Sequence, residues 1–283
     1  MRKLNDDEKY VILAAGTEKP FSGKYYLNHR FGKYSCKQCG LSLFNSQDQF
    51  DASCGWPSFD DAIGDNVKKR MDEDGVRDEV RCKKCEGHLG HIFVGEGFTI
   101  KNKRYCINSI SLDFKEDKIG KNEEVAYFAG GCFWGIESFF SKAKGVKSAN
   151  SGFMGGKTEN PTYEEVKKQG TGHIETVKVV FNKDKTNYEE LCRLFFEIHD
   201  PTQEDGQGPD KGPQYISAIF YDNLKQKKIC ETLISQLKDK SLKVVTKLTN
   251  AKGITFWGAE LYHQRYYSKN GRQPYCHGWI EKF

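Results

Sequence analysis

Four cysteines arranged as two short motifs are the residues whose spacing most directly suggests chemistry. Cys36 and Cys39 form one Cys-x-x-Cys motif, and Cys82 and Cys85 form a second one. Four thiolates suit a tetrahedral Zn²⁺ ion, because zinc accepts soft sulfur donors and imposes no other geometry. The motifs lie too far apart for a self-contained zinc ribbon, so we expect one structural zinc ion to join two distant hairpins. Two redox-active cysteine pairs are the alternative interpretation.

Cys106 is a candidate nucleophile. It lies in a segment with a strand-like sequence, and Arg104 stands two residues before it, on the same face of the expected strand. A cation in that position favours the thiolate, which is the reactive form of cysteine. A lone cysteine is more often a small buried apolar residue, so the neighbouring motifs must decide between the two interpretations.

Two further segments supply groups that could serve the same site. His88 and His91 follow directly after the second cysteine motif, so a metal there would fix the loop that presents both imidazoles. Cys54 lies in an expected turn next to Trp56, whose ring could hold an apolar methyl group. Taken singly, each of these residues also has an ordinary structural interpretation.

Together these segments resemble methionine sulfoxide reductase B over nearly the whole first domain. The resemblance rests on the two cysteine motifs and on the sequences CGWPSF, GHLGHIF and RYCINS. It implies that Cys106 attacks the sulfoxide and that Cys54 resolves the intermediate. Two histidines and an asparagine would bond the sulfoxide oxygen or a bound water, the arginine would support the thiolate, and the tryptophan would contact the methyl group. The substrate-binding residues implied are Trp56, His88, His91, Phe93, Arg104 and Asn108.

A second thiol, Cys132, stands where an expected strand turns into an expected helix, in the sequence GGCFWG. The N-terminus of a helix lowers the pKa of a thiol, and flanking glycines let a substrate approach closely. Phe133 and Trp134 would form an apolar wall beside it. The alternative is a cysteine that caps a core helix.

Later motifs bring an acid and two phenols. Glu175 stands at the start of an apolar strand, where partial burial could raise its pKa until it serves as a proton donor. Tyr163 and Tyr215 could donate hydrogen bonds to the sulfoxide oxygen. A glutamate on the surface of an edge strand and two structural tyrosines are the alternatives.

The sequences GCFWG, NPTY, TGHIE, HDPTQ and QYIS together resemble methionine sulfoxide reductase A, across about residues 125–276. The resemblance implies that Cys132 attacks sulfur and that Glu175 protonates the oxygen. The other site residues it implies are Phe133 and Trp134 in the methyl pocket, Tyr163 and Tyr215 as helpers of the acid, and Asp210 in support.

The C-terminal tail departs from many members of that family. They carry a glycine-rich tail with one or two recycling cysteines, whereas this tail is short and offers only Cys276. Ile216 also stands where an arginine is common. We therefore expect Cys276 to resolve the second intermediate. Cys230 lies on an apolar helical stripe and is expected in the core, and Cys192 stays unassigned.

Both resemblances imply the same reaction. A thiolate attacks the sulfoxide sulfur, methionine leaves, and the cysteine keeps the oxygen as a sulfenic acid, which a second thiol converts to a disulfide. An external dithiol must then reduce the disulfide, and thioredoxin is the expected partner. Because methionine sulfoxide is chiral at sulfur, each epimer needs its own enzyme. The resemblance assigns the R epimer to the Cys106 domain and the S epimer to the Cys132 domain.

The elements that position these residues divide the chain into two domains. Residues 115–124 contain one apolar side chain and no periodicity, as expected of a linker between domains 1–114 and 125–283. In the first domain, short apolar stretches between turn residues predict a mainly β structure with helix confined to its N-terminal region. The family resemblance implies two antiparallel sheets there.

The second domain alternates strand and helix patterns. We expect a strand at 125–129, a helix at 133–143, and a half-buried strand around 177–181. Apolar residues at helical spacing predict two more helices, which contain residues 191–198 and 230–237. This order predicts an α/β sandwich, and the resemblance implies a mixed, antiparallel-rich sheet.

Composition excludes several functional classes. The chain of 283 residues is 37% hydrophobic and 29% charged, which is typical of a globular protein. Its net charge of +5 is spread along the chain, which argues against a nucleic-acid partner. The sequence has no apolar run long enough for a membrane span and no secretory apolar region, so we expect no membrane association and a cytoplasmic location. In such a chain, ten cysteines indicate metal binding or thiol chemistry.

Two other functional classes remain alternatives. One is a thiol-based oxidant sensor, whose oxidation a partner protein reads. The other is a zinc-ribbon binding module joined to a single reductase domain, although clustered basic and aromatic residues are missing around both cysteine motifs. Turnover of a sulfoxide substrate separates an enzyme from a sensor, and an inert N-terminal half would favour the binding module.

Overall fold

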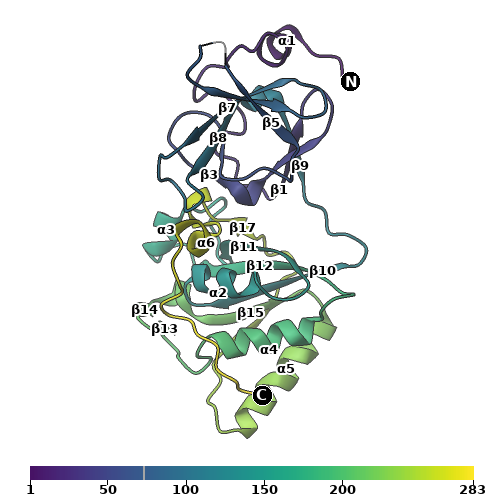
Figure 1. Cartoon of the computed structure of the whole chain (residues 1–283). Coiled ribbons are helices and arrows are strands. Elements are labelled where there is room, and N and C mark those ends of the chain that lie inside the picture. Colours follow the sequence, from purple (N-terminus) through teal and green to yellow (C-terminus); the bar gives the residue numbers. More distant parts are fainter. Residues whose placement is uncertain (73) are drawn as a thin grey trace. The chain divides into compact units, whose positions relative to one another are not determined.

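The computed structural model describes residues 1–72 and 74–283. These residues form two compact units, Met1–Lys118 and Ile119–Phe283, each with its own sheets and hydrophobic core (Figure 1). Strand β9 (Leu112–Glu116) and strand β10 (Glu123–Gly130) both reach into the segment 115–124.

The N-terminal unit combines one short helix with two antiparallel sheets. Helix α1 (Asp6–Ile12) begins with a capping box, in which the Asn5 side chain accepts from Glu8 N and the Glu8 carboxylate accepts from Asn5 N. One sheet has the strand order β2–β1–β9, and the other has the order β3–β4–β8–β7–β6–β5. The strands not yet given are β1 (Gly32–Cys36), β2 (Ser42–Asn45), β3 (Gln49–Phe50), β4 (Ser58–Phe59), β5 (Val67–Met71), β6 (Asp78–Cys82), β7 (His88–Val94) and β8 (Lys103–Ile107).

Aromatic side chains from both sheets form the core of this unit. The rings of Phe44 and Phe59 stack with centroids 4.4 Å apart, and Tyr34 meets Phe59 edge-on at 5.0 Å. The Tyr34 hydroxyl is fully buried, but it donates to Gln49 at 2.6 Å and accepts from Asn28 at 2.7 Å. A buried polar group with partners costs little, so the core tolerates this phenol.

The C-terminal unit is a mixed sheet covered by helices. The strand order is β16–β15–β10–β12–β11–β17, and only the β15–β16 pair is parallel among these neighbours. Its strands are β11 (Val146–Met154), β12 (Ile174–Asn182), β15 (Ser217–Tyr221), β16 (Lys247–Asn250) and β17 (Trp257–Gly258), with a separate pair β13 (Gly206–Gln207) and β14 (Asp210–Lys211). The helices are α2 (Phe133–Phe140), α3 (Tyr163–Lys167), α4 (Tyr188–Ile198), α5 (Leu224–Asp239) and α6 (Tyr266–Asn270).

Side-chain caps and ring stacking explain where these helices begin and what they cover. Asn187 and Asn223 accept from backbone N–H groups in the first turns of α4 and α5, which satisfies donors that have no helical partner. Phe128 of β10 stacks on Phe140 of α2 at 4.8 Å and on Phe195 of α4 at 5.1 Å. These contacts hold α2 and α4 on the same face of the sheet, next to the end of β10.

The fold class expected from the sequence is confirmed: a mainly β unit precedes a mixed α/β unit. Two local expectations were wrong. The first helix of the second unit ends at Phe140 instead of 143, because Lys142 N and Ala143 N bond three residues back in a tighter turn. Strand β12 is more buried than expected, because Thr176 and Val180 of the opposite face are buried along with Val177, Val179 and Phe181. Among the described residues, no helix is long and apolar enough to cross a membrane.

Candidate active sites and metal centre

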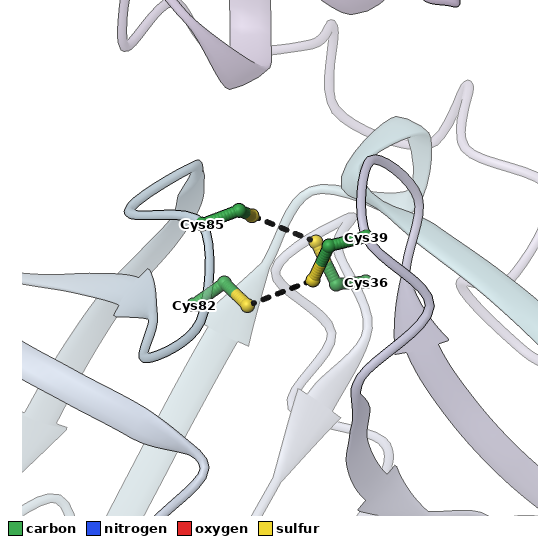
Figure 2. Close-up of side chains that lie close together, drawn as sticks. All are labelled: Cys36, Cys39, Cys82 and Cys85. Carbon is green, nitrogen blue, oxygen red and sulfur yellow. Dashed lines mark hydrogen bonds between the residues drawn. The ribbon is translucent and has the colours of Figure 1, made fainter. Parts of the chain in front are cut away.

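The four cysteines of the two motifs meet in the N-terminal unit (Figure 2). Cys36 and Cys82 end β1 and β6, and Cys39 and Cys85 follow in the turns after those strands. All four sulfur atoms lie within 4.8 Å of one another, and the Cys36–Cys85 and Cys39–Cys82 pairs are each 3.5 Å apart. Around a tetrahedral zinc ion with bonds of about 2.3 Å, sulfur atoms would stand about 3.8 Å apart. The cluster therefore fits a metal ion, and it joins a strand of one sheet to a strand of the other.

The thiols of Cys54 and Cys106 lie in contact in the same unit. Cys106 is in β8, directly opposite Ser58 of β4 and His91 of β7. Cys54 lies in the turn before β4, and its Sγ is 3.9 Å from that of Cys106. Gly55 follows with φ +90, a conformation that favours glycine. A disulfide needs a sulfur separation of about 2.05 Å, so a small rotation of the side chains would close the bond.

Arg104 lies beside the thiol pair. The Arg104 Nη1 group donates to Cys54 Sγ at 3.5 Å, and two bonds to Glu96 hold the guanidinium over the Phe93 ring. The hydrogen bond between the two thiols lowers the pKa of Cys54 to about 5, and the same bond together with burial raises the pKa of Cys106. These directions favour the thiolate at Cys54, whereas the sequence analysis expected Arg104 to favour it at Cys106. Arg104 lowers the pKa of Cys106 by its charge and by a hydrogen bond, but the contact with Cys54 and burial outweigh it.

His88 and His91 lie on β7, the strand next to β8. His88 Nδ1 bonds the Glu79 carboxylate at 2.6 Å, and His91 Nε2 bonds the Asp72 carboxylate at 2.7 Å. Burial lowers the pKa of His88, and its Nε2 has no hydrogen-bond partner within residues 1–72 and 74–283. The Glu79 carboxylate can only accept, so Nδ1 of the neutral ring carries the proton and Nε2 can accept a hydrogen bond from a bound water.

Asn108 and Glu18 position the loops around this thiol pair. Asn108 Nδ2 donates to Leu89 O at 3.1 Å, and its Oδ1 accepts from Glu18 N at 3.0 Å. Trp56 Nε1 donates to Glu18 O at 3.1 Å, while the Glu18 carboxylate accepts from Ile110 N at 3.2 Å. Asn108 therefore holds two loops together, and its Nδ2 has a second N–H group besides the one donated to Leu89 O. Glu18 was not predicted, because a single glutamate in a loop carries no pattern.

In the C-terminal unit, Cys132 is the N-cap residue of α2, and Gly131 alone separates it from the end of β10. Gly131 before it has φ +92, and a Cβ there would lie 2.3 Å from the Gln207 side chain, so only glycine fits. Glu175 of β12 is 2% exposed and accepts a hydrogen bond from Phe133 N at 3.0 Å. Burial and then the neighbouring Cys132 sulfur raise the pKa of Glu175 well above its usual range. The site thus holds a protonated carboxylic acid at the N-terminus of α2, close to a thiol.

Cys276 of the C-terminal tail lies against Cys132. The hydrogen bond between the two thiols and burial raise the pKa of Cys132, and they outweigh the lowering effect of the Trp134 backbone N–H. The net direction is opposite to that predicted from the helix N-terminus alone. Cys276 Sγ lies 3.0 Å from His277 Nδ1, and His277 Nε2 lies 2.7 Å from Gly130 O. The tail is thereby attached to the end of β10.

Tyr163 and Tyr215 lie together, and Asp210 bonds the tail. The two phenols hydrogen-bond each other, and burial raises the pKa of both, so both can donate at neutral pH. Asp210 accepts from the Tyr275 hydroxyl at 2.9 and 3.1 Å, and its charge contributes to the raised pKa of Glu175. Asp210 therefore supports the site through the tail and through its charge.

Phe133 and Trp134 belong to a larger aromatic cluster. Phe133 is 1% exposed with its ring 5.0 Å from that of His263, and Trp134 stacks on Tyr266 at 3.6 Å. The Trp134 Nε1 group donates to His263 Nδ1 at 2.9 Å, and burial lowers the pKa of His263 to about 3, so this imidazole is neutral. His263 and Tyr266 were missed, although the aromatic-rich sequence YHQRYY was a usable signal.

Cys192 and Cys230 form a separate buried pair between α4 and α5. Their sulfur atoms are 3.5 Å apart, and the Tyr188 hydroxyl lies 3.5 Å from Cys230 Sγ. Both cysteines are fully buried in the main hydrophobic core of the unit. The expectation that Cys230 is a core residue is met, and Cys192 joins it there.

Comparison with known proteins gives both units a family. The family model for peptide methionine sulfoxide reductase matches residues 124–283, and the model for the SelR domain matches residues 4–116. The chain is 43% identical over 153 residues to peptide methionine sulfoxide reductase MsrA of Ruthia magnifica, which is 54% of this chain and 91% of that protein. It is 47% identical over 154 residues to the MsrA of Sulfolobus acidocaldarius, covering 54% and 86%.

Solved structures agree with the assignment of the C-terminal unit. Methionine sulfoxide reductase A of Corynebacterium diphtheriae matches with a TM-score of 0.50 and 36% identity, over 56% of this chain and 79% of that one. Reduced Mxr1 from Saccharomyces cerevisiae matches with a TM-score of 0.53 and 29% identity, over 58% and 96%. The chain therefore belongs to the peptide methionine sulfoxide reductase family and carries a SelR domain ahead of its reductase A domain. It combines the two kinds of methionine sulfoxide reductase domain that the sequence motifs predicted, one for each epimer.

Proposed function

We propose that each domain performs its own reduction with its own pair of cysteines. Cys106 attacks the R epimer and Cys54 resolves the product, while Cys132 attacks the S epimer and Cys276 resolves it. The observation that carries this proposal is that each domain holds two thiols in hydrogen-bond contact, beside groups that can move a proton. A thiol pair in contact can capture a sulfenic acid before a third reactant reaches it.

At the Cys132 site, the neighbouring groups suit attack on a sulfoxide. The Cys132 thiolate attacks the sulfur atom, and protonated Glu175 gives its proton to the oxygen as negative charge develops there. Tyr163 and Tyr215 supply further hydrogen bonds to that oxygen. The rings of the aromatic cluster around Phe133 exclude water and accept the methyl group.

At the Cys106 site, the proton moves first between the two thiols. The two sulfur atoms lie 3.9 Å apart and either can be the donor, so a proton on Cys106 can pass to Cys54 and leave the attacking sulfur as the thiolate. Arg104 keeps a positive charge beside the pair in either state. The Nε2 of His88, which has no partner among the described residues, accepts a hydrogen bond from a bound water that can donate to the sulfoxide oxygen, with His91 next to it. Trp56, whose indole is anchored to the backbone of Glu18, would contact the methyl group.

The four-cysteine cluster holds a structural zinc ion in this proposal. Cys36, Cys39, Cys82 and Cys85 supply sulfur donors alone, and their spacing suits tetrahedral coordination. The ion supplies folding energy rather than chemistry, because four protein ligands leave no position open for a substrate. Cys82 ends the strand that precedes β7, so the ion helps to hold the strand that carries His88 and His91.

Both disulfides need an external reductant to complete the cycle. A thioredoxin suits this role, because thiol–disulfide exchange requires a dithiol of low reduction potential. The proposed substrate is methionine sulfoxide, free or in proteins, and the proposed location is the cytoplasm, where thioredoxin keeps thiols reduced.

The test is thioredoxin-dependent turnover of separated R and S methionine sulfoxide by three forms of the full chain: wild type, Cys106→Ser and Cys132→Ser. We expect each substitution to abolish reduction of one epimer and to spare the other. An epimer whose reduction survives both substitutions would show that one nucleophile is misassigned. A chain that is oxidised without turnover would favour the oxidant sensor.

A further inference from the structure

The C-terminal tail places an imidazole directly on the resolving thiol. Cys276 Sγ lies 3.0 Å from His277 Nδ1, while His277 Nε2 lies 2.7 Å from Gly130 O. A carbonyl oxygen can only accept a hydrogen bond, so Nε2 must carry the proton. Nδ1 of the neutral ring is then the acceptor, and the Cys276 S–H group donates to it.

Packing holds this ring in one orientation. His277 is 8% exposed, and a Cβ added to Gly135 of α2 would lie 2.1 Å from its Nδ1 atom. The ring therefore lies against the first turn of the helix that Cys132 caps. Because both nitrogens are engaged and the ring is enclosed, its tautomer and position are fixed before Cys132 is oxidised.

We propose that His277 is the general base that deprotonates Cys276 in the disulfide-forming step. This rests on the proposed function, in which Cys276 resolves the sulfenic acid of Cys132. His277 Nδ1 takes the S–H proton, and the Cys276 sulfur attacks the Cys132 sulfur with the released electron pair. The S–S bond forms as the S–O bond breaks, and the oxygen leaves as hydroxide. The imidazolium returns its proton to that hydroxide, so water leaves and His277 is neutral again.

The charged and titratable groups around His277 support this cycle. Asp210 of β14 stabilises the imidazolium by its charge, whereas His199 at the end of α4 is buried and neutral. Cys132 at the start of α2 carries the sulfenic acid that the step converts to a disulfide. Burial lowers the pKa of His277, so the ring is neutral and able to accept a proton at physiological pH.

Two substitutions of His277 separate its role as a base from its hydrogen bond to Gly130 O. In His277→Gln, the amide nitrogen takes the place of Nε2 and can still donate to Gly130 O, but no base remains at Nδ1. In His277→Asn, the amide lies where Nδ1 was, and the bond to Gly130 O is lost. Both are made in the full chain with Cys106→Ser, so that only the Cys132 site turns over.

The experiment mixes each protein with the S epimer without reductant and stops the reaction at set times. Mass spectrometry measures the Cys132–Cys276 disulfide and, after dimedone labelling, the Cys132 sulfenic acid, while released methionine is quantified in parallel. An unassisted thiol of pKa about 8.5 is only about 3% thiolate at pH 7. We therefore expect His277→Gln to lower the ratio of disulfide rate to methionine rate about 30-fold at pH 7, with sulfenic acid accumulating.

The pH profile decides between a base and a structural residue. In His277→Gln, the disulfide rate should rise tenfold per pH unit between pH 6 and 8, as thiolate replaces the missing base. A wild-type ratio in His277→Gln, or a slow rate that higher pH does not restore, would overturn the proposal. So would an effect confined to His277→Asn. Cys276→Ser is the control for the proposed function: if a disulfide to Cys132 still forms there, Cys276 is not the resolving thiol, whatever His277 does.

Discussion

Replacing Glu175 by glutamine tests the acid of the Cys132 site with the least structural change. The glutamine carbonyl can still accept the hydrogen bond that Phe133 N donates at 3.0 Å, so the start of α2 keeps its anchor. What is lost is the proton, which the buried carboxyl retains because its pKa is raised well above the usual range. The substitution therefore separates proton donation from positioning.

The expected size of the effect follows from general acid catalysis. A positioned proton donor contributes about 10²–10⁴ in rate, or about 3–5 kcal/mol of barrier, so reduction of the S epimer should fall by that factor. Reduction of the R epimer in the same protein should stay at the wild-type rate, because Glu175 belongs to the other unit. Each sample thus contains its own control for folding and concentration.

The pH dependence of S-epimer reduction is a second test of Glu175. A group whose pKa is raised stays protonated to higher pH, so the acid is present below the raised pKa and is lost as the pH rises through it. The wild-type S-epimer rate should therefore fall on the alkaline side, and Glu175→Gln should lack that fall. A loss of less than fivefold, or an equal loss for both epimers, would refute the assignment of Glu175 as the acid.

Three further substitutions test other parts of the structure. Cys39→Ser should abolish bound zinc in elemental analysis and lower the melting temperature of the N-terminal unit, with R-epimer turnover lost and S-epimer turnover kept; unchanged zinc content would contradict the metal assignment. Gly135→Ala should slow disulfide formation at least tenfold, because the new methyl group would overlap the His277 ring; an unchanged rate would mean that the tail is not held there. Cys276→Ala should lower the pKa of Cys132, since the bond to Cys276 is the largest cause of its increase. If the alkylation rate of Cys132 depended on pH in the variant as it does in the wild type, that contact would be contradicted.

The sequence predicted the strands and helices more reliably than the pKa values of the side chains on them. Strands and helices followed from spacing, since alternation and the 3.6-residue period report which side chains share a face. The thiol pKa values did not follow, because they depend on contacts between residues far apart in the chain. Cys132 does cap a helix, as expected, but the bond to Cys276 and burial outweigh the helix N-terminus.

Residues that act through backbone groups were also beyond the reach of sequence patterns. Glu18 accepts from one loop and anchors the indole of Trp56 with its carbonyl, although nothing in the segment around it marks a site. The position of His277 could not be predicted from the sequence, because its contact with Gly135 depends on how the tail packs and on the absence of a side chain at Gly135. Motifs identify groups that react, and tertiary packing identifies the groups that position them.

The two sites arrive at a similar arrangement from unrelated folds. Each has two thiols in hydrogen-bond contact, and in each the contact raises the pKa of the proposed attacking cysteine. The attacking thiol is therefore mostly protonated in the resting protein, which limits its oxidation by other reactants, since the thiolate is the reactive form. The two sites differ in the group that can take up the proton of a thiol. At the first site Cys54 is hydrogen-bonded to Cys106 and can take up its proton, whereas at the other site His277 lies beside Cys276. The thiol pairs are alike, but the groups that accept protons from them differ.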